Sequence, residues 1–232
     1  MKPTLFLLPG LLCDERVWAH QVQQLSALAD IRIPDFSQHD SLDAMADAVL
    51  HQAPAHFYVA GHSMGGRVAL QILSKAPDRI LKLGLLDTGT HAAKPGEAEK
   101  RQVLIDLASR EGMAALARAW APPMVHPERH HDAELMNAIF AMVESYSVSS
   151  FRQQVNALLH RPDALPFLAN APINTLVLCG REDAWSPPEQ HEVISRALRD
   201  QPPVTIIDNA GHMAPMERPE AVTAALRKWL GA

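Results

Sequence analysis

The sequence has few aromatic residues and no excess of basic charge. Aromatic side chains make up 5% of the 232 residues, and the formal net charge is −5, with Lys and Arg scattered along the chain. A nucleic-acid-binding surface needs a basic patch, and single-stranded nucleic acid also needs aromatic platforms on which its bases stack. We therefore predict no nucleic-acid partner.

Long hydrophobic runs are also missing. The apolar run Leu5–Leu8 follows Met1-Lys2 and precedes Cys13, an arrangement that superficially resembles a lipoprotein signal. Leu12 stands where such a signal has a small residue, and Pro9-Gly10 interrupts the run well short of a membrane span. We expect a cytoplasmic protein with no membrane partner.

Cysteine is scarce as well. The two cysteines, Cys13 and Cys179, each lie at the end of an apolar, strand-like run. This placement indicates buried free thiols rather than a disulfide framework. No spacing of His and Cys is typical of a zinc site, so we expect no metal.

Short apolar runs alternate with helical patterns along most of the chain. Hydrophobic residues make up 47% of the sequence, enough for a sizeable core. Wholly apolar runs are typical of strands buried on both faces of a parallel sheet. We predict strands at 4–8, 30–34, 56–60, 80–86, 173–179 and 204–207. Six strands separated by helices predict an α/β fold with a mostly parallel sheet and helices on both faces.

The segment from His91 to about Asn170 interrupts this alternation. It shows helical periodicities but no convincing strand. We therefore expect residues 1–90 and 171–232 to form the α/β core. Residues 91–170 would form a helical cap, inserted after the strand that ends near Asp87.

The segment Gly61-His62-Ser63-Met64-Gly65-Gly66 lies between a predicted strand and a helical stripe. In this setting, G-x-S-x-G places the serine on a sharp turn with strained backbone angles and an exposed hydroxyl. The N-terminus of the following helix favours a developing negative charge. The pattern predicts Ser63 as a nucleophile, and the side chain of His62 is expected to point away from it.

A serine hydroxyl needs a base to accept its proton and an acid to orient that base. His212, just past the last predicted strand, is the candidate base. Asp183, just past the preceding strand, is the candidate acid. Glu182 and Asp87 stay open as alternative acids, because each also follows a predicted strand.

An oxyanion hole needs two backbone N–H groups that face the developing charge. We expect one from Met64, the residue after the nucleophile, and the other from Leu11 in the loop after the first strand. Cys13 lies in the same loop, but a catalytic thiol is the weaker interpretation because Ser63 already has a complete set of partners.

With these motifs, the chain resembles the α/β-hydrolase fold over essentially its whole length. The resemblance rests on the order Ser, Asp, His and on the segments 8–12, 61–66, 176–183 and 211–219. It extends to the branch of capped esterases, C–C hydrolases and lyases similar to the menaquinone-pathway SHCHC synthase. It implies a sheet that lacks the usual first antiparallel hairpin, with the 30–34 strand at an edge. Pro9-Gly10 departs from the His-Gly that is usual in the oxyanion loop.

The resemblance implies a serine hydrolase that acts on a carboxylic ester, lactone or thioester through an acyl-enzyme. This serine chemistry needs no organic cofactor, and we expect none. The predicted partner is a small-molecule ester, for which we expect contacts with Arg67, Met124, Phe140 and Met213. Apolar side chains in the cap favour a small or medium acyl group, although residues at helical spacing also serve packing. We expect a monomer or a homodimer.

Three alternatives stay open. A pyruvate-eliminating lyase similar to SHCHC synthase is favoured by Arg67, which follows the elbow glycines as in that family, although His62 replaces the usual Tyr. A carrier-protein-linked acyl methyl esterase would need a basic docking face, whereas acidic and basic residues nearly balance in the 91–170 segment. A catalytically silent binding protein would have lost a triad residue, and this chain has lost none.

Overall fold

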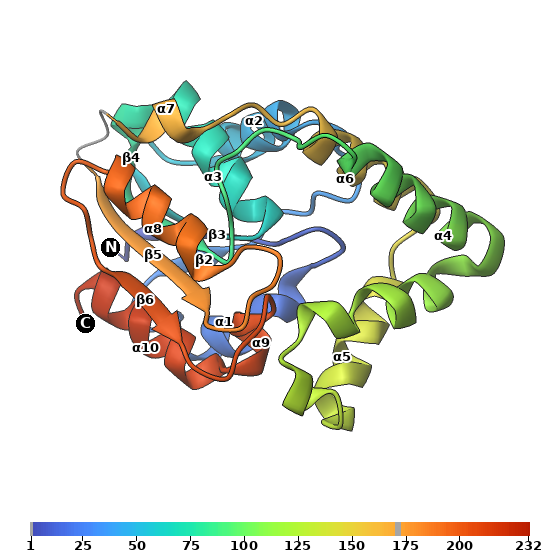
Figure 1. The fold of residues 1–232 in the computed structure, drawn as a ribbon. Helices are drawn as coiled ribbons and strands as arrows, with labels where there is room; N and C mark the ends of the chain where they lie inside the picture. The colour runs from blue at the N-terminus through green and yellow to red at the C-terminus, as the bar shows by residue number, and fades with distance from the viewer. Residues whose placement is uncertain (1, 170–172) are drawn as a thin grey trace.

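The computed structural model describes residues 2–169 and 173–232, which form one sheet covered by helices. The six strands run parallel in the order β2-β1-β3-β4-β5-β6 (Figure 1). They are β1 (Thr4–Leu8), β2 (Asp30–Arg32), β3 (Phe57–His62), β4 (Ile80–Leu86), β5 (Asn174–Gly180) and β6 (Val204–Ile207). The predicted parallel α/β sheet is confirmed, with β2 at an edge.

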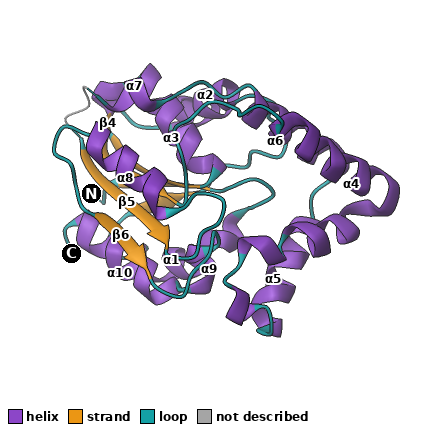
Figure 2. Cartoon of the chain, viewed as in Figure 1, coloured by secondary structure: helices purple, strands orange, loops and turns teal. Residues whose placement is uncertain are grey.

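Helices cover both faces of the sheet, as Figure 2 shows. On one face α2 packs on α3, and α8 packs on β5 and β6; on the other, α1 packs on α10. The helices are α1 (Ala19–Leu25), α2 (Leu42–Gln52), α3 (Met64–Lys75), α4 (Glu97–Trp120), α5 (Ala133–Glu144), α6 (Val148–Leu159), α7 (Leu165–Leu168), α8 (Pro188–Ala197), α9 (Ala214–Glu217) and α10 (Pro219–Leu230).

Several element ends differ from the predicted ones. β2 stops at Arg32, before Pro34, which has no N–H to offer a sheet ladder. β3 continues to His62, so the strand leads directly into Ser63. The single-turn helices α7 and α9 were not predicted, because one turn is too short for apolar periodicity to appear.

Between β4 and β5 the described chain contains only helices and connecting loops. The long helix α4 bends at Gly112, whose φ is 85°, and it packs against both α5 and α6. These three helices extend to one side of the sheet in Figure 1. None of the described helices, the 24-residue α4 included, combines the length and apolarity of a membrane span. Asn170 and Ala171, the predicted boundary of the inserted segment, lie outside the described residues.

Glycines allow α3 to lie against the ends of β1 and β3. A Cβ atom added to Gly65, in the first turn of α3, would lie 2.2 Å from the carbonyl oxygen of Leu8 at the end of β1. A Cβ atom added to Gly61 would lie 2.1 Å from the carbonyl oxygen of Gly65. Both neighbours are backbone atoms, so no side chain can move to make room.

We predict that Gly65→Ala lowers the free energy of unfolding by about 3 kcal/mol or more, because the new methyl group forces α3 away from β1. Urea unfolding followed by circular dichroism measures the change. Ser74→Ala on the exposed face of the same helix is the control and should stay within about 0.5 kcal/mol of the parent. A Gly65→Ala protein as stable as the control would contradict the close packing.

An ion cluster joins the start of α4 to Arg161, which lies two residues past the end of α6. The carboxylate of Glu97 lies 2.6 Å from Nη2 of Arg161 and 2.8 Å from Nη2 of Arg101. The Arg161 side chain is 3% exposed and that of Glu97 is 19% exposed. Burial alone would raise the pKa of Glu97, but the two guanidinium groups lower it to about 2.

Because this folded-state pKa lies below the usual 4.5, the ionised Glu97 stabilises the fold above pH 4.5, and the contribution disappears as pH falls toward 2. We expect Glu97→Gln to lower the free energy of unfolding at pH 7 by roughly 1–3 kcal/mol. The difference from the parent should shrink between pH 5 and pH 3 in urea unfolding. Glu99→Gln, on the exposed side of the same turn, is the control; a difference independent of pH would contradict the assignment.

Candidate active site

Ser63 occupies the sharp turn between β3 and α3. Its φ of 55° and ψ of −115° lie in a backbone region that residues other than glycine rarely adopt, as the sequence predicted. Hydrogen bonds hold this backbone on both sides: its N–H donates to the Leu86 carbonyl (2.9 Å), and its carbonyl accepts from Gly66 N–H (3.0 Å) and Thr88 Oγ1 (2.8 Å). The strained turn is therefore supported by β4 and by the loop that follows it.

The structure brings Ser63, His212 and Asp183 together in one hydrogen-bonded chain. His212 Nε2 lies 2.7 Å from Ser63 Oγ, and His212 Nδ1 lies 2.8 Å from Asp183 Oδ2. The second oxygen of Asp183 accepts from the N–H groups of Trp185 and Ser186, each at 2.8 Å. Burial alone would raise the pKa of Asp183, but His212 and these donors hold it below its usual range. An ionised Asp183 accepts from Nδ1–H, so Nε2 faces the serine hydroxyl as an acceptor.

The two alternative acids have other partners. Glu182 Oε2 accepts from the Ala210 N–H at 3.1 Å. Asp87 Oδ1 accepts from the Gly180 N–H at 2.8 Å, and burial together with the charge of Asp183 raises the pKa of Asp87 well above its usual value. Among the described residues, only Asp183 contributes a carboxylate hydrogen bond to His212.

His62 does not face the Ser63 hydroxyl, in line with expectation, but it contacts His212 in another way. Its Nε2 lies 2.7 Å from the His212 carbonyl oxygen, and the two ring centroids are 5.4 Å apart. Burial and the nearby His212 lower the pKa of His62 to about 3, so the ring is neutral at pH 7. A neutral His62 can donate from Nε2–H and hold the His212 backbone, a contact the sequence did not reveal.

Glu217, on α9, is a second supporting residue that the sequence analysis did not single out. It is fully buried, and its carboxylate accepts from the N–H groups of Gly211 (2.9 Å), Met213 (3.2 Å) and His126 (2.8 Å). Burial raises its pKa, although the three N–H donors oppose that shift. Glu217 thus holds the residues on either side of His212. The available signal was its position in the 211–219 segment, where an acidic residue follows the apolar run 213–216.

Of the predicted oxyanion donors, Met64 directly follows Ser63, and Leu11 follows Gly10, which packs against Ser63. Met64 is the first residue of α3, and a Cβ atom added to Gly10 would lie 3.2 Å from the Ser63 Cβ. Within residues 2–169 and 173–232, the N–H groups of Leu11 and Met64 have no hydrogen-bond acceptor. Two N–H groups beside a hydroxyl, one of them at a helix N-terminus, form an arrangement that can receive negative charge.

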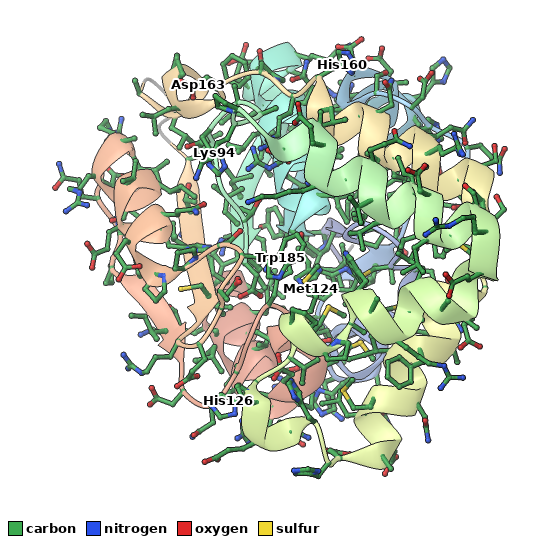
Figure 3. The ribbon with its side chains drawn as sticks, turned by 45° about the vertical axis from the view of Figure 1, so that its right-hand side comes forward. Lys94, Met124, His126, His160, Asp163 and Trp185 are labelled. Carbon is green, nitrogen blue, oxygen red and sulfur yellow. The ribbon has the colours of Figure 1, made fainter. Side chains whose placement is uncertain are left out.

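A cavity of about 510 Å³ opens beside Ser63 and His212. Trp185 forms part of its wall, with a ring centroid 6.3 Å from that of His212. Figure 3 locates Trp185 and Lys94, another lining residue, between the sheet and the helices of the inserted segment. The charged residues that line the cavity are Arg67, Lys94, Glu97, Lys100, Arg101 and Arg161.

Arg67 is the one predicted substrate contact that lines this cavity. Its Nη1 donates to the His91 carbonyl at 2.8 Å, and burial together with the charge of Arg161 lowers its pKa to about 9. The other three are packed elsewhere. Met124 and Met213 are buried, and the Met124 carbonyl accepts from His212 N–H at 2.8 Å, whereas Phe140 packs against the core. Contact of these three with a substrate stays a prediction.

The two cysteines are free and buried, as predicted. Burial raises the pKa of Cys13 to about 12, so the thiol is protonated at neutral pH. In the described part of the chain, no group of three His, Cys, Asp or Glu side chains is placed to hold a metal ion.

The chain is similar to several enzymes of known name. The pimeloyl-[acyl-carrier protein] methyl ester esterase of Nitrosomonas europaea is 32% identical over 92 residues, which cover 36% of each chain. The 2-succinyl-6-hydroxy-2,4-cyclohexadiene-1-carboxylate (SHCHC) synthase of Serratia proteamaculans is 26% identical over 99% of this chain and 93% of its own. A thermophilic esterase from Thermogutta terrifontis superimposes with a TM-score of 0.89 at 28% identity, over 100% of this chain and 90% of its own.

The family model covers nearly the whole protein. The model described as the alpha/beta hydrolase family matches residues 5–225, a range that includes strands β2 to β6, all but the first residue of β1, and the residues around Ser63. The parallel sheet and the strand–turn–helix that carries Ser63 agree with that match. The chain belongs to the alpha/beta hydrolase family of enzymes, as its sequence predicted.

Proposed function

We propose that the protein is a serine hydrolase that cleaves a carboxylic ester, lactone or thioester of a small molecule. The observation that carries this proposal is the continuous hydrogen-bonded chain from Asp183 through His212 to Ser63, with distances of 2.8 and 2.7 Å. A serine oxygen 2.7 Å from an oriented imidazole nitrogen is ready to lose its proton during attack on a carbonyl.

In the proposed reaction, Ser63 Oγ attacks the carbonyl carbon while its proton moves to His212 Nε2. Asp183 keeps the ring oriented and stabilises the imidazolium, and the N–H groups of Leu11 and Met64 receive the oxyanion. Collapse of the tetrahedral intermediate breaks the bond to the alcohol or thiol, which takes the proton from His212. Water then attacks the acyl-enzyme by the same route, and the acid and the free Ser63 hydroxyl are released.

The charge of the cavity supports a substrate that carries a carboxylate. Five cationic side chains line the cavity and Glu97 is its single acidic residue. Glu97 already pairs with Arg161 and Arg101, whereas Arg67 has no carboxylate within ion-pair distance among the described residues. A guanidinium whose pKa is lowered by burial and by a neighbouring cation gains most from an anionic ligand.

A second candidate is a lyase that eliminates pyruvate, as SHCHC synthase does. The same cationic cavity favours it, and the Serratia proteamaculans enzyme of that name aligns over nearly the whole chain. A carrier-linked acyl methyl esterase receives support from the names of other relatives, such as the Nitrosomonas europaea enzyme. Among the three, the small-molecule esterase needs the fewest assumptions about partners, and it is tested first.

We predict that Ser63→Ala lowers kcat by about 10³-fold or more on a panel of p-nitrophenyl esters from acetate to decanoate. His212→Ala should be similarly inactive, and the double variant should be no worse than either single one, because the two residues act as a unit. Ser74→Ala is the control with normal activity. Ester turnover that survives in Ser63→Ala would refute the assignment of Ser63 as the nucleophile. A folded parent that cleaves no ester would shift support to the lyase.

The carboxylate proposal predicts a preference between two matched esters. We expect a kcat/KM about tenfold higher for p-nitrophenyl hydrogen adipate than for its neutral methyl ester, and Arg67→Gln should abolish this preference. Arg67→Lys should keep part of it. Arg110→Gln, on the exposed surface of α4 outside the cavity, is the control. Equal rates on the two esters in the parent would count against an anionic substrate.

A further inference from the structure

The loop after β1 contains a turn that a leucine residue does not favour. The N–H of Cys13 donates to the Gly10 carbonyl at 3.2 Å, which makes Gly10–Cys13 a four-residue turn. Leu12, at its third position, has a φ of 55°, where glycine or asparagine is the usual residue. Because a leucine in this conformation costs free energy, contacts from outside the turn must maintain it.

Gln154, on α6, supplies the main contact. Its Oε1 accepts from the Leu12 N–H at 2.9 Å, across 142 residues of sequence, and its Nε2 donates to the Phe36 carbonyl at 3.3 Å. The Gln154 side chain is fully buried. The amide has one satisfactory orientation, because a flip would place its NH₂ group against the Leu12 N–H and its oxygen against the Phe36 carbonyl.

Two further bonds hold the same turn. The Cys13 thiol donates to the Leu11 carbonyl at 3.4 Å, and the Tyr146 hydroxyl, which lies just before α6, donates to the Cys13 carbonyl at 2.6 Å. Both polar groups of the peptide between Leu11 and Leu12 therefore have a partner: the N–H has Gln154 and the C=O has Cys13. With that peptide plane held on one side and Gly10 packed against Ser63 on the other, little freedom remains for Leu11.

We propose that Gln154 is a positioning residue that orients the Leu11 N–H toward the oxyanion of the reaction. The inference rests on the proposed hydrolase function and adds to it a residue from the inserted helices. Without Gln154, the Leu12 N–H is buried and unpaired, and the turn relaxes toward negative φ. That relaxation rotates the peptide between Leu11 and Leu12. The backbone of Leu11 then readjusts, which moves the Leu11 N–H away from the position of the oxyanion.

The change should appear in kcat, because oxyanion hydrogen bonds form in the transition state, whereas substrate binding changes little. We expect Gln154→Met, which conserves volume but cannot accept from Leu12, to lower kcat by about 10- to 100-fold with KM within about twofold. Gln154→Glu, which keeps an acceptor oxygen, should retain more activity than Gln154→Met. Asn156→Ala is the matched control, since its Nδ2 bonds the Asp40 carbonyl from the same helix and makes no contact with the turn.

A thionoester substrate separates an oxyanion effect from a structural one. Sulfur in place of the carbonyl oxygen accepts hydrogen bonds poorly, so an enzyme with a well-placed oxyanion hole prefers the oxygen ester. The ratio of kcat/KM for oxygen ester over thionoester should fall in Gln154→Met and stay unchanged in Asn156→Ala. An unchanged ratio in Gln154→Met would overturn the proposal, even if its activity falls. Activity that persists in Ser63→Ala would overturn this inference together with the proposed function.

Discussion

The strained, positive-φ backbone of Ser63 is the constraint on which the rest of the site depends. A side chain in this conformation is tolerated only where its surroundings fix the chain on both sides. Here β4 and the loop after it supply two hydrogen bonds and Gly66 of α3 supplies a third, and the close approach of α3 to β1 and β3 requires glycine at 61 and 65. The turn directs the serine hydroxyl out of the sheet, above the ends of the parallel strands, where the loops that carry Asp183 and His212 converge.

Around this turn, hydrogen bonds to polar groups, some from neighbouring residues and some from distant segments, hold each loop in place. Glu217 and the Met124 carbonyl hold the His212 loop, the N–H groups of Trp185 and Ser186 hold Asp183, and Gln154 holds the turn that contains Leu11. Each buried acceptor would be costly if left unpaired, so these contacts favour one arrangement of the loops. Local contacts also give the two buried carboxylates at the strand ends, Asp183 and Asp87, different protonation states. Asp183 is stabilised as an anion by His212, whereas burial and the charge of Asp183 favour the protonated form of Asp87.

The inserted helices contribute to the site in two ways. The start of α4, together with Arg161 in the loop after α6, gives the cavity most of its charge, and α6 itself reaches the turn after β1 through Gln154. Charge in the cavity and support of the oxyanion loop therefore depend on the same packed helices. Under the proposed mechanism, a substitution in these helices that leaves the sheet intact alters activity through the position of a backbone N–H rather than through a substrate contact.

The sequence by itself determined the parallel sheet and the edge position of β2, because apolar runs and turn residues act locally. It also singled out Ser63, His212 and Asp183 as candidates, because their chain order is typical of the fold, and the structure brings these three residues together. It did not decide between Asp183 and its alternatives Glu182 and Asp87, since all three follow strands; hydrogen-bond geometry and burial made that choice. The roles of Gln154, Glu217 and His62 came only from the tertiary structure. Each acts through backbone groups, which for Gln154 and His62 lie far away in the chain, and a backbone group carries no residue-specific signal that a sequence pattern could reveal.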